Sequence, residues 1–315
     1  MTLTVLATDF GGPEVLSVLD VPVAAPGPAE VLVGVRAVGT NPVDFKSYSG
    51  AFGRDPAQLP IRLGREASGI VRAVGDDVEG PGGPIRVGDE VVVYPVEGAY
   101  ADELLVPAAS VLPKPSTMSF AEASGLMVAG TTAIHALTVT GVKAGKTVVI
   151  HGGSGGVGLV AIQLAVANGA HVIATASPPR HAYLRELGAV PVSYGEGLIE
   201  RLRSLAPAGF DAAIDMVGTD EALDASVALV ADRQRIATIA GFQKGFELGV
   251  RVLGGAPGAD PGVIIRSTAR MELVRLAEAG SVGVLVAETF PLSEAAAAHR
   301  ELARGHTHGK IVLLP

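Results

Sequence analysis

The sequence of 315 residues contains no cysteine. This absence excludes disulfide bonds, thiolate zinc sites, iron–sulfur clusters and a cysteine nucleophile. Positive charge is also scarce, because 24 Lys and Arg stand against 32 Asp and Glu, and the basic residues form no block. A net charge of −8 without a basic block argues against nucleic acid as a partner.

The sequence also shows little that would direct the chain to a membrane. The first basic residue is Arg36, so the N-terminus lacks the basic region of a secretory signal. Residues 147–176 are strongly apolar, but they include five glycines within 152–158 and the polar residues His151 and Asn168. This pattern favours a strand, a glycine turn, a buried helix and a second strand over one membrane helix. We therefore expect a soluble, cytoplasmic protein with no membrane partner.

The chain changes in character along its length, and its length suits two domains. The first third predicts short strands separated by turns rich in Pro and Gly, at residues 3–7, 30–38, 69–74 and 90–94. From about residue 147, apolar strands alternate with helices, at 147–151, 157–168, 171–176, 190–194, 197–206, 210–215 and 235–240. Such alternation is typical of βαβ units in a parallel sheet that is buried on both faces.

Two further parts of the chain predict individual elements. Ser119 and Glu122 have the spacing of a capping box, which indicates that a helix begins there. The tail predicts helices at 270–279 and 293–303 and a final strand at 310–314.

The pattern Gly153-x-Gly155-x-x-Gly158 directly follows a predicted strand and opens a predicted helix. In so glycine-rich a chain, about 0.7 such matches are expected by chance, so the context carries the argument. Glycines there allow a tight turn and let helix N–H groups approach a pyrophosphate. The sequence therefore predicts a dinucleotide site, against the alternative of an ordinary glycine-rich turn.

The residues after the second strand indicate which dinucleotide binds. A ribose-binding Asp or Glu is expected about 20 residues after the glycine turn, but no acidic residue lies between Gly158 and Glu186. Ser177 and Arg180 stand there instead, and a hydroxyl with a guanidinium suits a 2′-phosphate. We expect NADPH rather than NADH, with Arg180 as a solvated surface charge being the alternative.

Several segments together resemble the zinc-independent quinone oxidoreductase branch of the medium-chain dehydrogenase/reductase superfamily. In chain order they are AVGTNPVD at 37–44, GREASG at 64–69, VGDEV at 87–91, AGTTA at 129–133, GSGGVG at 153–158 and GKIVL at 309–313. The resemblance implies an α/β fold in which a Rossmann doubly wound parallel sheet accompanies a GroES-like β-barrel catalytic domain. The catalytic domain is expected at residues 1–120, completed by about 256–315, and the NADPH-binding Rossmann domain at 121–255.

The resemblance also bears on metal binding. Zinc-dependent relatives have a Cys in the place of Asn41 and a His in the place of Arg65, so we expect no metal site. His306 and His308 are interpreted as two exposed residues of a tail loop rather than as ligands. We interpret Glu66, beside Arg65, as one half of a structural ion pair and not as a catalytic carboxylate.

The resemblance assigns roles to individual residues, and these stay expectations. Thr131 would contact the nicotinamide ribose or the substrate, and Asn41 and Asp44 would line the floor of the active site. The remaining cofactor residues are Gly153, Gly155, Gly156, Val157 and Gly158 at the pyrophosphate, Ser177, Arg180 and Tyr194 around the 2′-phosphate, and Gly241 and Phe242 beside the nicotinamide. For Tyr194, packing of a strand-end aromatic ring on the core is an equal alternative.

The expected reaction is hydride transfer from NADPH to a quinone or an α,β-unsaturated carbonyl. Without zinc, a simple alcohol lacks a Lewis acid for its alkoxide, whereas a conjugated acceptor delocalises the charge that hydride creates. The candidate donors to that charge are Asn41, Lys46, Tyr48 and Thr131, with Lys46 as a solvated charge being an equal alternative. Relatives usually have an Arg in the place of Tyr48, which would change the polar lining at the mouth of the substrate site.

Two other functions stay open on the sequence. An enoyl-thioester reductase would need a basic site for the phosphates of its carrier, and none is evident. A non-catalytic NADPH-binding protein, such as a sensor or a lens crystallin, would retain the glycine turn but lose the polar set that Asn41, Asp44 and Thr131 form. Relatives suggest a homodimer, with the apolar stretch 246–253 as a candidate edge strand or inner strand.

Overall fold

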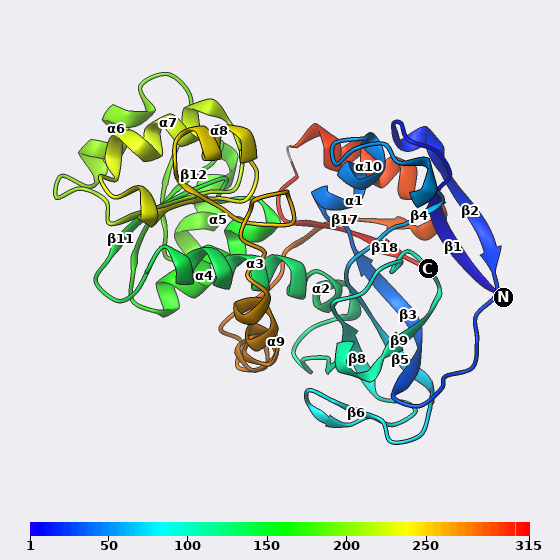
Figure 1. Cartoon of the computed structure of the whole chain (residues 1–315). Helices are drawn as coiled ribbons and strands as arrows, with labels where there is room; N and C mark the ends of the chain where they lie inside the picture. Colours follow the sequence, from blue (N-terminus) through cyan, green and yellow to red (C-terminus); the bar gives the residue numbers. More distant parts are fainter. Residues whose placement is uncertain (306) are drawn as a thin grey trace. The chain divides into compact units, whose positions relative to one another are not determined.

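The structure is a computed structural model that describes residues 1–305 and 307–315. The chain forms two compact units, unit 1 from residues 1–128 with 270–315, and unit 2 from residues 129–269 (Figure 1). Relative to the boundaries expected from the sequence, residues 121–128 lie in unit 1 and residues 256–269 lie in unit 2.

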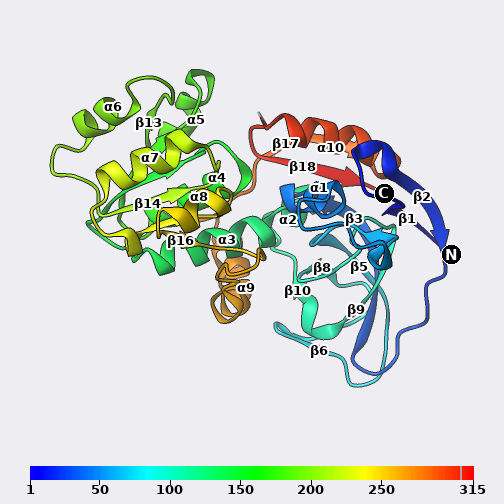
Figure 2. The same ribbon diagram turned by 45° about the horizontal axis from the view of Figure 1, so that its top comes forward.

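Within the described residues, unit 1 contains a seven-stranded sheet in the order β10-β8-β5-β3-β18-β17, with β9 also paired to β3. These strands are β3 (Glu30–Gly39), β5 (Ala67–Val74), β8 (Glu90–Val93), β9 (Glu103–Pro107), β10 (Val111–Pro113), β17 (Val286–Pro291) and β18 (Lys310–Leu314). The C-terminal β18 pairs with β3 through Val312 opposite Gly39 and Leu313 opposite Val38. The last strand of the chain thereby completes the sheet that the first third begins (Figures 1 and 2).

Unit 1 also has smaller sheets and short helices around this core. Its remaining strands are β1 (Thr2–Ala7), β2 (Leu16–Val21), β4 (Ile61–Arg62), β6 (Glu79–Gly80) and β7 (Gly83–Pro84). Its helices include α1 (Pro42–Ser49), α2 (Phe120–Ser124) and α10 (Ala295–Arg304). The predicted capping box is confirmed, because Ser119 N donates to the Glu122 carboxylate and Glu122 N donates to Ser119 Oγ. Helix α10 packs on β17, β18 and α1, so the tail closes one side of the hydrophobic core of unit 1.

Unit 2 contains a parallel sheet whose order, β13-β12-β11-β14-β15-β16, is that of a doubly wound Rossmann fold. Its strands are β11 (Thr147–His151), β12 (His171–Thr175), β13 (Val190–Val192), β14 (Ala212–Asp215), β15 (Ile236–Thr238) and β16 (Arg251–Val252). The helices between them are α4 (Gly156–Ala167), α5 (His181–Glu186), α6 (Leu198–Leu205), α7 (Asp220–Leu229) and α8 (Phe242–Glu247). Val148, Val149 and Ile150 are fully buried, as a central strand covered on both faces requires. The predicted fold class is confirmed.

Two elements differ from the sequence expectation. The stretch 246–253 is not one strand, because α8 runs to Glu247 and only β16 at Arg251–Val252 is extended, at the edge of the sheet. Gly249, with φ of +67°, makes the turn between them, a backbone conformation that glycine adopts freely. Helix α9 (Val263–Glu278) begins seven residues before the predicted start, and its first two side chains, Val263 and Ile264, are 69% and 79% exposed. Apolar residues at exposed positions do not follow the alternation of buried apolar and exposed polar residues that marks an amphipathic helix, so the sequence does not indicate this first turn.

Helix α3 (Leu126–Val139) is the other long helix of the chain, and with α9 it completes the helices named above. Among the described residues, no helix is long and apolar enough to cross a membrane.

Candidate active site

The glycine turn of unit 2 connects β11 to α4. A Cβ atom on Gly153 would lie 2.8 Å from the Cβ of Ala174, and one on Gly158 would lie 2.2 Å from the carbonyl oxygen of Gly152. Packing therefore requires glycine at both positions. A Cβ on Gly155 would meet nothing closer than 3.6 Å, which is ordinary van der Waals contact. Gly155 instead leaves space beside the backbone, where a ligand can approach closely.

Helix α4 begins without help from a side chain. Gly155 is its N-cap and offers no hydrogen-bond acceptor beyond its own backbone. The first N–H groups of an α-helix have no partner within the helix, and the helix dipole places partial positive charge there. The start of α4, at Gly156 and Val157, is therefore suited to an anion such as a pyrophosphate.

The end of the neighbouring strand β12 carries the predicted phosphate-binding residues. Ser177 is the N-cap of the short 3-10 helix Pro178–Arg180, which follows β12, and Arg180 is the last residue of that helix. In the part of the chain that the structure describes, no ion pair or hydrogen bond is formed by the Arg180 guanidinium. Tyr194, just beyond β13, is 55% exposed, so the alternative that its ring packs on the core is wrong.

The other cofactor residues of unit 2 lie within α3 and at the start of α8. Thr131 is buried in α3, Gly241 is the N-cap of α8, and Phe242 is the first residue of that helix. Their contacts with a nicotinamide stay predictions.

Two buried groups at the strand ends of unit 2 were missed by sequence reasoning. The Asp215 carboxylate, at the end of β14, accepts hydrogen bonds from the N–H groups of Val217 and Gly218 at 3.0 and 2.9 Å. It also accepts one from Thr238 Oγ1 at 2.6 Å, so it ties the ends of β14 and β15 together. His151 ends β11, and burial lowers its pKa to about 4, so its imidazole is neutral at pH 7. Their position as the last residue of a buried strand was the available signal.

In unit 1, Asn41 belongs to a buried charged network rather than to an open surface. Lys310 Nζ forms an ion pair with Glu66 Oε1 at 2.9 Å and donates to Asn41 Oδ1 at 2.7 Å. Asn41 Nδ2 donates to the same Glu66 oxygen at 3.0 Å, so both ends of the amide are occupied. The prediction of an Arg65–Glu66 pair is wrong, because Arg65 is exposed and pairs with Glu97 at 3.5 Å.

Asp44 lies on α1 with its side chain 2% exposed. Its Oδ2 atom accepts hydrogen bonds from Asn41 N at 2.8 Å and from the Tyr100 hydroxyl at 3.2 Å. Burial raises the pKa of Asp44 to about 6, and these two donors, Lys310 and Arg65 oppose the rise. A buried carboxyl with such a pKa exchanges its proton near neutral pH.

A cavity of about 410 Å³ adjoins Asp44. It is lined by Asp44, Ser47, Phe52, Gln58, Pro60, Ile61, Arg62, Leu63, Gly64, Arg65 and Glu97. The lining combines apolar side chains with two carboxyl groups, a hydroxyl, an amide and two guanidinium groups, which suits a flat conjugated molecule with polar oxygens.

Asp44 was predicted to line the floor of the active site, and it lines this cavity, whereas the predicted donors of unit 1, Asn41, Lys46 and Tyr48, do not. Tyr48 is 1% exposed, and its hydroxyl lies 2.7 Å from His299 Nδ1, so the expectation that it lines a substrate mouth is wrong. It points into the core because apolar residues of unit 1 surround it. Lys46 is half-buried, and burial lowers its pKa, so it is not a fully solvated charge.

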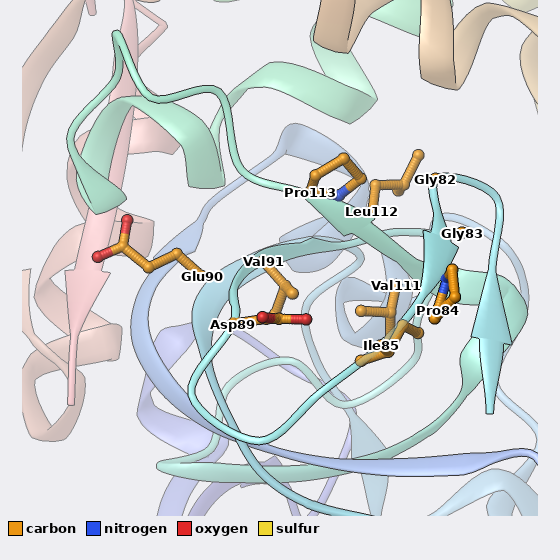
Figure 3. Close-up of a pocket in the computed structure, with 10 residues that line it drawn as sticks. All are labelled: Gly82, Gly83, Pro84, Ile85, Asp89, Glu90, Val91, Val111, Leu112 and Pro113. Carbon is orange, nitrogen blue, oxygen red and sulfur yellow. The ribbon is translucent and has the colours of Figure 1, made fainter.

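A second cavity of unit 1, about 270 Å³, lies between the β6–β7 hairpin and strands β8 and β10 (Figure 3). Its ionisable lining residues are two acids, Asp89 and Glu90. The Asp89 carboxylate accepts a hydrogen bond from Arg86 N at 2.8 Å. A lining with no cationic side chain is poorly matched to an oxyanion, so the cavity beside Asp44 is the candidate acceptor site.

Across residues 1–305 and 307–315, no group of three His, Cys, Asp or Glu side chains is placed to hold a metal ion. His306, one of the two tail histidines considered above, lies outside the described residues.

A GroES-like unit and a Rossmann unit with this glycine turn together define an oxidoreductase of the medium-chain dehydrogenase/reductase superfamily. Two family models match, an alcohol dehydrogenase GroES-like domain at residues 27–116 and a zinc-binding dehydrogenase at residues 187–313. The quinone oxidoreductase of Mus musculus is 33% identical over 323 residues, covering 97% of this chain and 96% of the relative. The chain belongs to the quinone oxidoreductase branch of the superfamily.

Solved structures agree with this assignment. The Escherichia coli quinone oxidoreductase complexed with NADPH is 29% identical, with a TM-score of 0.85 and full coverage of both chains. A mycobacterial protein complexed with NADPH is 32% identical, with a TM-score of 0.84 and full coverage of both chains.

Proposed function

We propose that the protein is an NADPH-dependent quinone oxidoreductase that transfers a hydride to a quinone or an α,β-unsaturated carbonyl without zinc. The observation that carries the cofactor choice is the guanidinium of Arg180, which has no partner among the described residues and lies in the segment after β12, where an NADH enzyme needs an acid. Relatives that contain NADPH support the same choice.

The residues present fit this cofactor. Gly155 leaves room for a pyrophosphate at the uncapped start of α4. Ser177, Arg180 and the exposed Tyr194 would hold the adenosine 2′-phosphate, and Thr131, Gly241 and Phe242 would contact the nicotinamide half. When bound, NADPH supplies the hydride. The protein has to bind and orient the cofactor and the acceptor, and to neutralise the charge that forms on the acceptor.

The donor set in unit 1 supports a reaction without zinc. Both amide atoms of Asn41 are held by Glu66 and Lys310, and Arg65 carries a cation where zinc-dependent relatives have a neutral ligand. A conjugated acceptor needs no Lewis acid because its oxygen takes up the charge as an enolate or a hydroquinone anion. The guanidinium groups of Arg62 and Arg65 line the cavity in which that charge would form.

The test is oxidation of NADPH and of NADH by the purified protein, with a panel of quinones, enones, simple ketones and enoyl thioesters. We expect NADPH to be consumed with quinones or enones and not with simple ketones. Turnover with enoyl thioesters alone would favour the thioester reductase, and NADPH binding without turnover would favour a non-catalytic role. Either result would overturn the proposal.

We also propose a cytoplasmic location and a homodimer, as the sequence predicts. Fractionation of cells that contain the protein tests the location. Sedimentation of the purified protein at several concentrations tests the dimer, and a mass of one chain at all concentrations would exclude it.

A further inference from the structure

A buried chain of hydrogen bonds leads from Asp44 into the core of unit 1. The Tyr100 hydroxyl bonds to Asp44 Oδ2 at 3.2 Å and to His299 Nε2 at 2.7 Å, and His299 Nδ1 bonds to the Tyr48 hydroxyl at 2.7 Å. The residues come from three distant parts of the sequence, namely α1, the segment before β9, and α10. All three partner residues are buried, and the ring of His299 stacks on Tyr48, with centroids 5.7 Å apart and planes 7° apart.

The hydrogen bonds from Tyr48 to Asp44 all run in one direction when Asp44 is ionised. Burial lowers the pKa of His299 to about 4, so the imidazole is neutral and carries one N–H. Tyr100 donates its proton to Asp44, so its oxygen accepts from His299 Nε2–H. Nδ1 is then an acceptor, and Tyr48 donates to it. Every hydroxyl and ring nitrogen is satisfied in this arrangement, which fixes the tautomer of His299.

We propose that Asp44 is the proton donor to the reduced acceptor, and that Tyr48, His299 and Tyr100 form a positioning relay that controls its protonation. The inference rests on the proposed function and assigns that reaction a source for its proton. Both hydrogen bonds to the Asp44 carboxyl within the described residues fall on Oδ2. Since Asp44 also lines the cavity of about 410 Å³, Oδ1 is the oxygen left to face an acceptor there.

The step balances as follows. A hydride brings one proton and two electrons to a quinone, which leaves NADP⁺ and a hydroquinone monoanion. The O–H bond of protonated Asp44 then breaks, and a new O–H bond forms on the anionic hydroquinone oxygen. The Asp44 carboxylate that remains is stabilised by Asn41 N–H and the Tyr100 hydroxyl, and it regains a proton from hydronium or a buffer acid of the solvent, whose conjugate base leaves.

The charges around the relay come from every element packed against it. Lys310 on β18 and Arg65 before β5 lower the pKa of Asp44. Burial raises the pKa of Tyr100, and Asp44 and Glu66 add to the rise. Burial also raises the pKa of Tyr48, with Asp44 and Glu14 adding to the rise and Arg300 opposing it. Burial outweighs the two cations at Asp44, and its pKa of about 6 leaves roughly a tenth of the molecules protonated at pH 7.

The first experiment measures kcat against pH with a quinone as acceptor, for the wild type and for Tyr100→Phe. Activity that needs protonated Asp44 falls as pH rises through the pKa of about 6. Loss of the Tyr100 donor destabilises the carboxylate, so the midpoint should move up by about one pH unit with an unchanged KM for NADPH. Tyr48→Phe should shift the midpoint in the same direction by less, because the hydrogen bond that it removes, from Tyr48 to His299, lies further from Asp44.

Ser68→Ala is the matched control. Ser68 is buried in the same unit, and its hydroxyl donates to the Phe120 carbonyl at 2.6 Å, outside the relay. Its loss should lower stability and leave the midpoint in place. Asp44→Asn should remove the pH dependence and lower kcat by about 10²–10⁴-fold. An unshifted midpoint in Tyr100→Phe, or a retained pH dependence in Asp44→Asn, would overturn the proposal.

A second measurement is independent of turnover. In ¹⁵N-labelled holoprotein with NADPH bound, the chemical shifts of His299 at pH 8 should show a protonated Nε2 and an unprotonated Nδ1. The reverse tautomer would overturn the relay even in an active enzyme. Conversely, a wild type that consumes no NADPH with any quinone or enone would sink the proposed function, while the tautomer would still report on the relay.

Discussion

At the scale of single residues, charge pairing decides which side chains are available to ligands. Glu66, Lys310 and Asn41 satisfy one another in the core of unit 1, whereas Arg180 has no ion-pair partner among the described residues. A side chain whose polar atoms all have hydrogen-bond partners stabilises the fold. An unpaired guanidinium after a strand is available to bind a phosphate. Whether a charged side chain is available to a ligand therefore depends on the partner that it has in the fold and not on its residue type.

Arg180→Glu should reverse the cofactor preference. A carboxylate repels a 2′-phosphate and accepts from a ribose 2′-hydroxyl, so kcat/KM for NADPH should fall at least tenfold while that for NADH rises. Steady-state kinetics with both cofactors test this. Arg185→Glu, on the neighbouring helix α5, is the control for a general change in charge. An unchanged NADPH/NADH ratio in Arg180→Glu would remove the phosphate-binding role.

Lys310→Met should strongly destabilise unit 1. The substitution leaves the buried Glu66 carboxylate without its cation, and breaking such a pair costs about 3–5 kcal/mol. Urea unfolding measures the loss. Lys310→Met combined with Glu66→Gln should recover much of it, because no unpaired charge then stays buried. A double variant as unstable as the single one would show that packing, and not charge, accounts for the effect.

At the scale of elements, the glycine turn separates structural from ligand-facing positions within six residues. Gly153 and Gly158 pack against neighbouring atoms, and Gly155 does not. Their spacing alone predicts the turn but not this division, which depends on where Ala174 of β12 and the Gly152 carbonyl lie. The two classes of glycine give a matched pair of substitutions.

Gly158→Ala should lower the free energy of unfolding of unit 2. Gly155→Ala should weaken NADPH binding without loss of stability. The first places a Cβ 2.2 Å from the Gly152 oxygen, and overpacking of this kind costs about 1–3 kcal/mol. The second leaves the fold intact but fills the space that a pyrophosphate needs. Thermal unfolding and NADPH titration distinguish them. Equal effects of the two variants on stability would contradict the division.

Much of the secondary structure of unit 2 follows from local pattern, whereas the site of unit 1 does not. Strand β11 was predicted at its observed bounds, and α4 was predicted within one residue, because apolar runs and the glycine turn mark both. The sequence misplaces Tyr48 and gives no sign of His299, because the roles of both residues depend on the contact of α1 with α10. Tyr48 and His299 are 251 residues apart in the sequence. Glu66 was assigned the adjacent Arg65 for the same reason, since nothing local indicates Lys310. Long-range pairing of buried polar groups leaves no periodic signal in a sequence.

At the scale of the whole molecule, buried histidines make stability depend on pH. The pKa of His151 is about 4 when folded, below the usual 6.5, so its contribution to stability is complete above about pH 6.5 and declines as pH falls toward 4. Linkage gives a loss of about 2 kcal/mol between pH 8 and pH 5. His151→Gln should flatten the pH dependence of the urea midpoint by about that amount. A curve parallel to the wild type would show that burial of His151 does not shift its titration.

Asp44 and His299 act in opposite directions on unit 1. The raised pKa of Asp44 stabilises the fold as pH falls through 6, whereas the lowered pKa of His299 destabilises it. The relay that sets the protonation of Asp44 thereby joins two groups whose effects on acid stability partly cancel.

The pairing of β18 with β3 also has a consequence for synthesis of the chain. Residues 30–39 leave the ribosome early, but their neighbour in the sheet, residues 310–314, is made much later. Unit 2 is continuous from residue 129 to 269 and has all its strands before the tail emerges. Domains generally fold as units during translation, so unit 2 should reach its native state first. The edge of β3 at Val38 and Gly39, with which β18 pairs, then stays unpaired until residues 310–314 emerge, and this is the interval in which a nascent chain most needs protection by a chaperone.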